Sequence, residues 1–356
     1  MKAGAYSLYW EDVDERLMYA ELDDLSWKSP EQLFGYKKAD SLYIYHHGKL
    51  AAFYSTKDIE EEARVGYQFY SRAENVSRVI KIKQGAKKRV DAFIAAHQGL
   101  DVQKLDDEQL HELMLKALDH CLAALHAHFL TQAQFFERFE SEGGLEHVAR
   151  LEELSKARFE YSRKAWSAAL GFSHTLFKEY GKRHGLTLAE SESMTREELD
   201  AEKWDRNVLG QRAHKFVITS KFHNQTIFVG EKVDEYIRTY EQYGDIKSVK
   251  GIIGNPGIVK APAFVLKNEH LDLKDLPTGM KKGMILIVQN SWPELSSYYQ
   301  FASAIVTNEG GITSHGVVVA REFGIPCIVA TKIATKIFNT GDMVEVDADK
   351  GIVLKV

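Results

Sequence analysis

The pattern of apolar and polar positions divides the chain near residue 243. Before that point apolar residues recur at the spacing of amphipathic helices, and after it short apolar runs alternate with turns. Of the 25 glycines, 13 lie in the first 243 residues and 12 in the last 113. Five of the six prolines also lie in the last part. We therefore predict a helical region over residues 59–243 and a different, turn-rich domain over residues 244–356.

One long amphipathic helix is predicted over residues 106–139. Its apolar positions are Leu110, Met114, Leu118, Leu122, Leu125, Phe129, Phe136 and Phe139. Steps of three, four and seven place them on one helical face. Two glycines at 143 and 144 end the pattern, and a second helix is predicted over residues 146–181. A capping-box pattern at Thr195–Glu198 starts a third helix, so this region is predicted to be a helical bundle.

Two β-hairpins are predicted outside these helices. Their strands are 41–45 with 50–54, and 215–219 with 226–229. We assign His46 and His47 to the turn of the first hairpin rather than to a metal site. A short helix is predicted at 231–243 after the second hairpin. Residues 1–58 have a mixed pattern and are predicted to form a separate small α/β segment.

The last region, residues 244–356, has the pattern of an α/β domain with short connections. The predicted strands are 258–266, 284–288, 304–307, 327–330, 343–346 and 352–356. The predicted helices are 294–301 and 315–323. The fold class is therefore a multidomain α and α/β protein, mostly helical up to residue 243 and ending in a β/β/α domain.

Composition and charge narrow the class of protein. A net charge of −5 gives no electrostatic reason to expect binding to nucleic acid or to an anionic membrane. No apolar run is long enough to span a bilayer, and the N-terminus lacks the pattern of a signal peptide. The two cysteines are far apart, which predicts no disulfide. Histidines 111, 120, 126 and 128 are poorly spaced for a shared metal ion. We expect a cytoplasmic protein with no metal site.

The stretch from Glu309 to Val329 carries the strongest chemical signal. A predicted strand runs into Gly310 and Gly311, and then Thr313, Ser314 and His315 open a predicted helix. Thr313 or Ser314 can cap that helix, and the free amides and dipole of a helix N-terminus favour an anion such as phosphate. Histidine can act as a nucleophile through a ring nitrogen. From these local features alone, a catalytic histidine and a capping or core histidine are equally supported.

A longer pattern around these residues resembles a known family. The pattern consists of Gly310-Gly311, Thr313-Ser314-His315, Ala320-Arg321-Glu322, Gly324 and Pro326. In residue type and register it is similar to the motif of the phosphohistidine (swivelling, or mobile) domain of phosphoenolpyruvate-utilising enzymes. That group includes phosphoenolpyruvate synthase, pyruvate phosphate dikinase and rifampin phosphotransferase. The resemblance extends over about 245–356. It departs at Gly316-Val317, where small alanines are usual, and we expect activity to survive this change.

The resemblance implies a role for each residue of the motif. It implies that His315 receives a phosphoryl group and hands it on, and that Thr313 orients the imidazole or holds the phosphate. Ser314, Gly310 and Gly311 are weaker candidates for the same task. Arg321 either pairs with phosphate or makes a structural ion pair, and both roles stay open.

The family also implies what this chain would need from outside. We find no glycine-rich phosphate loop before residue 243 and no room for a barrel after His315. We therefore predict a phosphotransferase component that resembles the C-terminal part of phosphoenolpyruvate synthase-like and rifampin phosphotransferase-like proteins without their ATP-grasp domain. The expected partners are a separate ATP-grasp subunit, which would bring Mg-ATP, and a small-molecule acceptor. No cofactor is expected on this chain alone.

Two other functions compete with this prediction. The first is a non-catalytic binding or regulatory subunit of a phosphoenolpyruvate synthase-like complex. The second is a self-contained kinase, which is disfavoured because residues 1–58 are too few for an ATP-grasp fold. Four histidines of the helical region are candidate bases for a hydroxyl acceptor, although surface or packing roles explain them more simply. They are His174, His184, His214 and His223.

Overall fold

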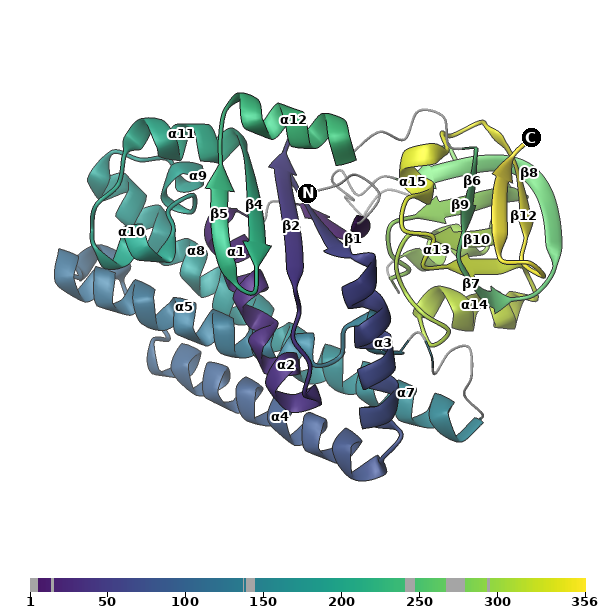
Figure 1. The fold of residues 1–356 in the computed structure, drawn as a ribbon, viewed down its shortest axis with the longest axis horizontal. Coiled ribbons are helices and arrows are strands. Elements are labelled where there is room, and N and C mark those ends of the chain that lie inside the picture. The colour runs from purple at the N-terminus through teal and green to yellow at the C-terminus, as the bar shows by residue number, and fades with distance from the viewer. Residues whose placement is uncertain are drawn as a thin grey trace. The chain divides into compact units, whose positions relative to one another are not determined.

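A computed structural model describes residues 6–13, 16–136, 138, 145–240, 247–266, 279–292 and 295–356 (Figure 1). The chain forms two compact units, residues 1–240 and residues 241–356. Each unit has its own sheet and its own hydrophobic core. The protein is thus a mixed α/β chain with a largely helical first unit. Within the described residues, no helix is both long enough and apolar enough to cross a membrane.

The sheet of the first unit joins segments from both ends of that unit. Its five antiparallel strands have the order β1-β3-β2-β4-β5. The bounds are β1 Tyr6–Val13, β2 Asp40–His46, β3 Lys49–Ser55, β4 Lys215–Lys221 and β5 Asn224–Phe228. Both predicted hairpins are present. The structure differs from the three-part division of the sequence, because β2 pairs with β4 and residues 1–58 thereby belong to the first unit.

Three long helices pack side by side in this unit, as Figure 1 shows for α4, α5 and α8. Their apolar faces share one core with inward-facing sheet residues such as Tyr43 and Tyr45. The helix bounds are α1 Leu17–Ser26, α2 Lys28–Phe34, α3 Thr56–Tyr70, α4 Ala73–Ala96, α5 Asp107–Phe129, α7 Leu145–Ala157, α8 Lys164–His184, α9 Leu188–Ser191, α10 Arg196–Asp200, α11 Arg206–His214 and α12 Glu231–Tyr240. The capping box predicted at Thr195 is present.

The long helix predicted over 106–139 is wrong at residues 130–136, because α5 ends at Phe129, and Phe139 lies outside the described residues. The chain turns there and forms a short 3-10 segment, Ala133–Phe136. This turn buries Phe135 among aromatic rings that include Trp27 and Phe34. Carbonyls left free at a helix end need partners. The Lys83 Nζ donates to the carbonyl of Ala127, and the Tyr70 hydroxyl donates to the carbonyl of Leu130.

The helix predicted over 146–181 contains a local irregularity. A π-helical turn, Arg158–Arg163, separates α7 from α8. The side chain of Ser162 donates to the carbonyl of Arg158 at 3.1 Å within this turn. It also contacts the Lys83 ammonium at 3.2 Å. The interruption therefore lies where a buried lysine is held against the helix.

The second unit is built on an eight-stranded sheet with the order β6-β13-β12-β8-β9-β10-β11-β7. Four adjacent strands of this sheet run parallel to one another, namely β8, β9, β10 and β11. The strand bounds are β6 Ser248–Lys250, β7 Ile252–Asn255, β8 Ile258–Leu266, β9 Met284–Val288, β10 Ala302–Thr307, β11 Cys327–Val329, β12 Met343–Asp347 and β13 Ile352–Lys355. The helices are α13 Ser296–Tyr299, α14 His315–Phe323 and α15 Ala334–Ile337.

The central strands of this sheet are covered on both faces, which explains their unbroken apolar sequence. Ile285 and Ile287 of β9 belong to a core with α15 and β12. Leu286 and Val288 of the same strand belong to the opposite core, with α13 and α14. Strands β6 and β7 were not predicted, because Gly251 separates these short runs, Gly254 interrupts the second and Pro256 follows it, as in a turn. Helix α14 has the predicted bounds.

Candidate functional site

The candidate site lies where parallel strands of the second unit end. Because β9, β10 and β11 are parallel neighbours, the connections that follow them leave from one edge of the sheet. Ligands in α/β sheets usually bind at this carboxyl edge. His315 is the first residue of α14, which directly follows the β10 connection. The fold therefore places the histidine of the sequence motif at the edge where a ligand is expected.

The imidazole of His315 is half-buried at the start of α14. Its ring lies 5.8 Å from the ring of Tyr299, with 58° between the two planes. The Tyr299 hydroxyl donates to the carbonyl of Trp292 at 3.1 Å, which fixes that ring. Amides in the first turn of an α-helix have no partner within the helix. The histidine thus has an aromatic wall on one side and anion-binding amides nearby.

Ser314, not Thr313, is the N-cap residue, and it caps through its backbone alone. Its N–H donates to the carbonyl of Gly311 at 2.9 Å, which closes the glycine turn. The Ser314 Oγ is buried and has no hydrogen-bond partner among the described residues. Thr313 is half-buried, and no hydrogen bond of its side chain is found in the described part of the chain. Neither hydroxyl group is therefore used in a hydrogen bond by the described part of the chain.

The glycine turn depends on Gly310. Its φ of 106° is a conformation that favours glycine. A Cβ at this position would lie 3.1 Å from the Ser314 Cβ and 3.2 Å from its Oγ. The turn therefore brings backbone, not side chain, against the Ser314 hydroxyl.

A polar network supports the connection between β10 and α14. The Asn308 side-chain amide donates to the Gln289 Oε1 and to the Thr335 Oγ1, both at 2.6 Å. The Asn308 Oδ1 accepts from the Thr335 N–H at 3.0 Å. The Gln289 amide donates to the Glu309 Oε1 at 2.7 Å. Sequence reasoning missed this network, and its only signal was a set of polar residues directly after two apolar strands.

Arg321 lies far from the imidazole along the helix. Its Nε donates to the carbonyl of Gly254 at 3.2 Å, which ties α14 to β7. A separation of six residues corresponds to about 9 Å along the axis and a face roughly 120° away from that of His315. Of the two roles left open by the sequence, this contact favours the structural one, although the partner is a carbonyl oxygen and not a carboxylate.

Packing explains why glycine occupies position 316, and the sequence did not indicate this. A Cβ at this position would lie 2.7 Å from the Cβ of Ser291 and 3.1 Å from its Oγ. The first turn of α14 therefore rests directly on the connection that follows β9. Ser291 thus occupies the space that the methyl group of an alanine at position 316 would need.

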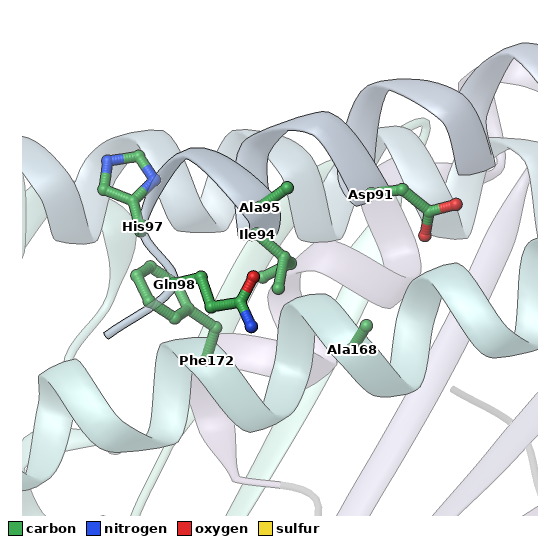
Figure 2. A pocket seen from close by; sticks show the side chains of 7 residues that line it. All are labelled: Asp91, Ile94, Ala95, His97, Gln98, Ala168 and Phe172. Carbon is green, nitrogen blue, oxygen red and sulfur yellow. The ribbon is translucent and has the colours of Figure 1, made fainter. Parts of the chain in front are cut away.

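The first unit contains a shallow groove between the end of α4 and the middle of α8 (Figure 2). Its volume is about 430 Å³. The lining residues are Asp91, Ile94, Ala95, His97, Gln98, Ala168 and Phe172. The His97 Nδ1 lies 2.8 Å from the carbonyl of Phe93, so this nitrogen carries the hydrogen. The lining combines apolar side chains with three polar ones, Asp91, His97 and Gln98.

The four histidines considered for a metal site have separate partners. The Nε2 atoms of His111 and His126 contact the carbonyls of Leu199 and Leu25. His120 stacks on Phe93, and His128 contacts Arg158. In the described ranges, no three His, Cys, Asp or Glu side chains are grouped as metal ligands would be.

Comparisons with known proteins agree with the geometry of the second unit. Residues 280–351 match the family described as "PEP-utilising enzyme, mobile domain". In the C-terminal region, a probable phosphoenolpyruvate synthase of Archaeoglobus fulgidus is 39% identical over 105 residues, which are 30% of this chain and 13% of that protein. The phosphoenolpyruvate synthase of Aeropyrum pernix is also 39% identical over 105 residues, covering 30% of this chain and 12% of that protein.

Residues 280–351 are thus similar to the mobile domain of phosphoenolpyruvate-utilising enzymes, and this similarity supports a phosphohistidine-carrying phosphotransfer domain. The matched part spans only 13% and 12% of the length of the two synthases. Among solved structures, Enzyme I (nEIt) covers 80% of this chain and 80% of its own at 15% identity with a TM-score of 0.21. A TM-score this low has no bearing on the fold.

Proposed function

We propose that this chain is a phosphocarrier, in which His315 accepts a phosphoryl group from an ATP-dependent protein and passes it to a small-molecule acceptor. One observation carries the proposal. His315 opens α14 at the carboxyl edge of parallel strands, inside a stretch that matches the mobile domain of phosphoenolpyruvate-utilising enzymes.

The proposed chemistry is nucleophilic. A ring nitrogen of His315 attacks phosphorus, and the bond from phosphorus to the leaving oxygen breaks with its electron pair on oxygen. The phosphoryl oxygens would then be held by amides of the first turn of α14 and by the hydroxyls of Thr313 and Ser314. The unpartnered Ser314 Oγ supports this assignment, because a bound phosphoryl group would supply its missing partner.

The donor and the acceptor are proposed to meet the chain separately. The donor would be an ATP-grasp protein that binds Mg-ATP. The similarity to phosphoenolpyruvate synthases is confined to the C-terminal region, so the first unit is proposed to bind either this donor or the acceptor. No cofactor is assigned to the chain itself.

The test is to label the protein and locate the phosphate. The chain is incubated with its co-purifying ATP-binding protein, Mg²⁺ and ATP labelled in the β or the γ position, and in parallel with phosphoramidate, which phosphorylates reactive histidines directly. We expect an acid-labile, alkali-stable label that is lost in His315→Ala. His184→Ala is the matched control, because His184 packs against Tyr180 and Trp204. Phosphate label that persists in His315→Ala would overturn the proposal. A wild-type chain that never takes up label would fit a non-catalytic subunit instead.

A further inference from the structure

In the second unit, the connection that follows β9 lies against the start of α14 through Ser291. If Gly316, the second residue of α14, carried a Cβ, that atom would lie 2.7 Å from the Ser291 Cβ and 3.1 Å from its Oγ. The half-buried Ser291 side chain therefore fills the space beside the Gly316 backbone. Glycine at position 316 thus admits a hydroxyl group to the turn that begins with His315.

The same connection also reaches the imidazole. The ring of Tyr299, at the far end of the connection, lies 5.8 Å from the His315 ring. The Tyr299 hydroxyl donates to the carbonyl of Trp292, the residue after Ser291, at 3.1 Å. Ser291 is therefore tied to the tyrosine that contacts the imidazole, while its own side chain contacts the backbone of the next residue. These contacts place the Ser291 hydroxyl close to the histidine.

Hydroxyl groups near this turn differ in how the chain uses them. The Thr307 Oγ1 donates to the carbonyl of Glu309, and the Thr331 Oγ1 donates to the carbonyl of Thr307 at 2.8 Å. Both of these hydroxyls hold the connections in place. The Ser291 Oγ, in contrast, has no hydrogen-bond partner among the residues that the structure describes. A hydroxyl can donate one hydrogen bond, and the fold does not use that of Ser291.

Two backbone donors lie next to this hydroxyl. They are the N–H groups of His315 and Gly316, the first two residues of α14, and neither donates to an acceptor within the described ranges. The Val317 N–H, which follows them, donates to the carbonyl of Ser314 at 3.0 Å. Free N–H groups at the start of a helix favour a negatively charged ligand. A neutral hydroxyl from a second segment therefore stands beside amides that favour an anion.

We propose that Ser291 is a further phosphate-binding residue, whose hydroxyl donates a hydrogen bond to an oxygen of the phosphoryl group on His315. This inference rests on the proposed function, and it assigns part of the site to a segment outside the motif around His315. A hydrogen bond to an ionised acceptor is stronger than one between neutral groups. Because the hydroxyl carries no charge, it holds the phosphoryl oxygens without the attraction of a cation, and the group stays transferable.

The experiment measures how strongly His315 holds a phosphoryl group. The full chain is equilibrated with a fixed ratio of phosphoimidazole to imidazole at about pH 8, where the phosphoryl group is a dianion. Exchange between two imidazole rings needs no other reactant, and phosphorus-31 NMR measures the loaded fraction of His315. We expect Ser291→Ala to lower the equilibrium constant for loading about 10-fold or more, the size of one hydrogen bond to a charged group. Ser291→Thr keeps the hydroxyl and should retain most of the wild-type value.

The pKa of the bound phosphoryl group gives a second readout, which a packing role for Ser291 would not change. A donated hydrogen bond favours the dianion, so the phosphorus-31 titration of Ser291→Ala should have its midpoint at a higher pH than that of the wild type. This variant keeps the Cβ that packs against Gly316, and its urea midpoint should stay close to that of the wild type. Ser296→Ala, at an exposed serine of α13, is the matched control and should leave loading and pKa unchanged.

The outcomes separate this inference from the proposed function. Equal loading and an equal phosphoryl pKa in the wild type and Ser291→Ala would overturn the role of Ser291 and leave the carrier role intact. A loss of loading that Ser296→Ala shares would overturn it as well. A wild-type chain whose His315 takes up no phosphoryl group would overturn both proposals, and this is seen before any variant is compared.

Discussion

Two side chains of the first unit have raised pKa values, and each makes the folded state less stable as pH rises. Burial raises the pKa of Glu21 to about 7, even though its carboxylate accepts the Arg196 N–H at 3.0 Å. Asp24 and then Glu31 raise the pKa of His223 to about 9. The two shifts predict losses of stability in different pH ranges.

For Glu21, the unfolded chain releases the proton at a lower pH than the folded chain does. The folded state therefore loses stability as pH rises from about 4.5 to about 7, by about 3 kcal/mol in all, and the loss stays constant above that range. We expect Glu21→Gln to remove this loss while keeping an acceptor for Arg196. Urea unfolding at pH 5 and pH 8 should show a larger stabilisation at pH 8. The exposed Glu60→Gln is the control, and an equal effect at both pH values would contradict the prediction.

For His223, stability also falls as pH rises, but here the folded state loses a stabilising charge, because the imidazole is charged when it is protonated. The stabilisation by its ion pairs is fully present below about pH 6.5 and is lost as pH rises through about 9. His223→Gln should therefore be clearly less stable than the wild type at pH 6 and close to it at pH 10. Thermal unfolding of both proteins at these pH values measures the difference. A deficit of the same size at pH 10 would show that the turn itself, not the charge, is responsible.

The sequence identifies some residues of the site and not others. His315 and Gly310 stand in a local strand–turn–helix pattern, so a short stretch is enough to predict them. Asn308 contacts Gln289 and Thr335, which follow other strands, and only the fold brings them together.

The first turn of helix α14 packs closely against Ser291. Gly316→Ala should destabilise the protein by roughly 1–3 kcal/mol, because the added methyl overlaps Ser291 and this outweighs the gain in helix propensity. Adding Ser291→Gly should restore most of the loss. Gly171→Ala on α8 is the matched control, since no atom lies within 4 Å of its added Cβ, and it should stabilise by about 0.5–1 kcal/mol. Urea midpoints report all four proteins, and a tolerated Gly316→Ala without Ser291→Gly would be the contrary result.

Elements were predictable where periodicity alone decides them. Helix α14 and strands β8 and β9 have the bounds that the sequence predicts. Helix α5 ends earlier than the sequence predicts. The apolar spacing continues through Phe136, although the chain turns before that residue. The turn is decided by packing, as Phe135 fits against Gly66 of α3, where a side chain would overlap it. That fit depends on two distant segments and has no local signature.

At the scale of the molecule, the two units have separate cores and are expected to unfold in separate steps. Gly66→Ala would press against the backbone of Phe135 and should lower only the transition of the first unit. Gly254→Ala would bring a methyl group to 2.6 Å from Val317 Cγ2 and should lower only that of the second. Differential scanning calorimetry of the three proteins tests this. A single transition shifted equally by both variants would mean that the units unfold as one.

The division into units was only partly accessible from sequence. The change in glycine and proline content near residue 243 reflects a change of architecture. The membership of residues 1–58 could not be predicted, because strand pairing over a long distance leaves no trace in local periodicity. Antiparallel partners such as Ile44 and Val217 become neighbours only in the folded chain.

The pairing of β2 with β4 also has a consequence for synthesis on the ribosome. The hairpin of β2 and β3 is complete at Ser55, but its partner strand begins only at Lys215. At roughly 5–20 residues per second, the ribosome needs about 8–32 s to make the intervening segment. During that time the edge of β2 that later pairs with β4 has no partner strand. Early emergence of this hairpin makes the first unit a natural client of chaperones that bind strand edges, whereas the sheet of the second unit is made within a single shorter stretch.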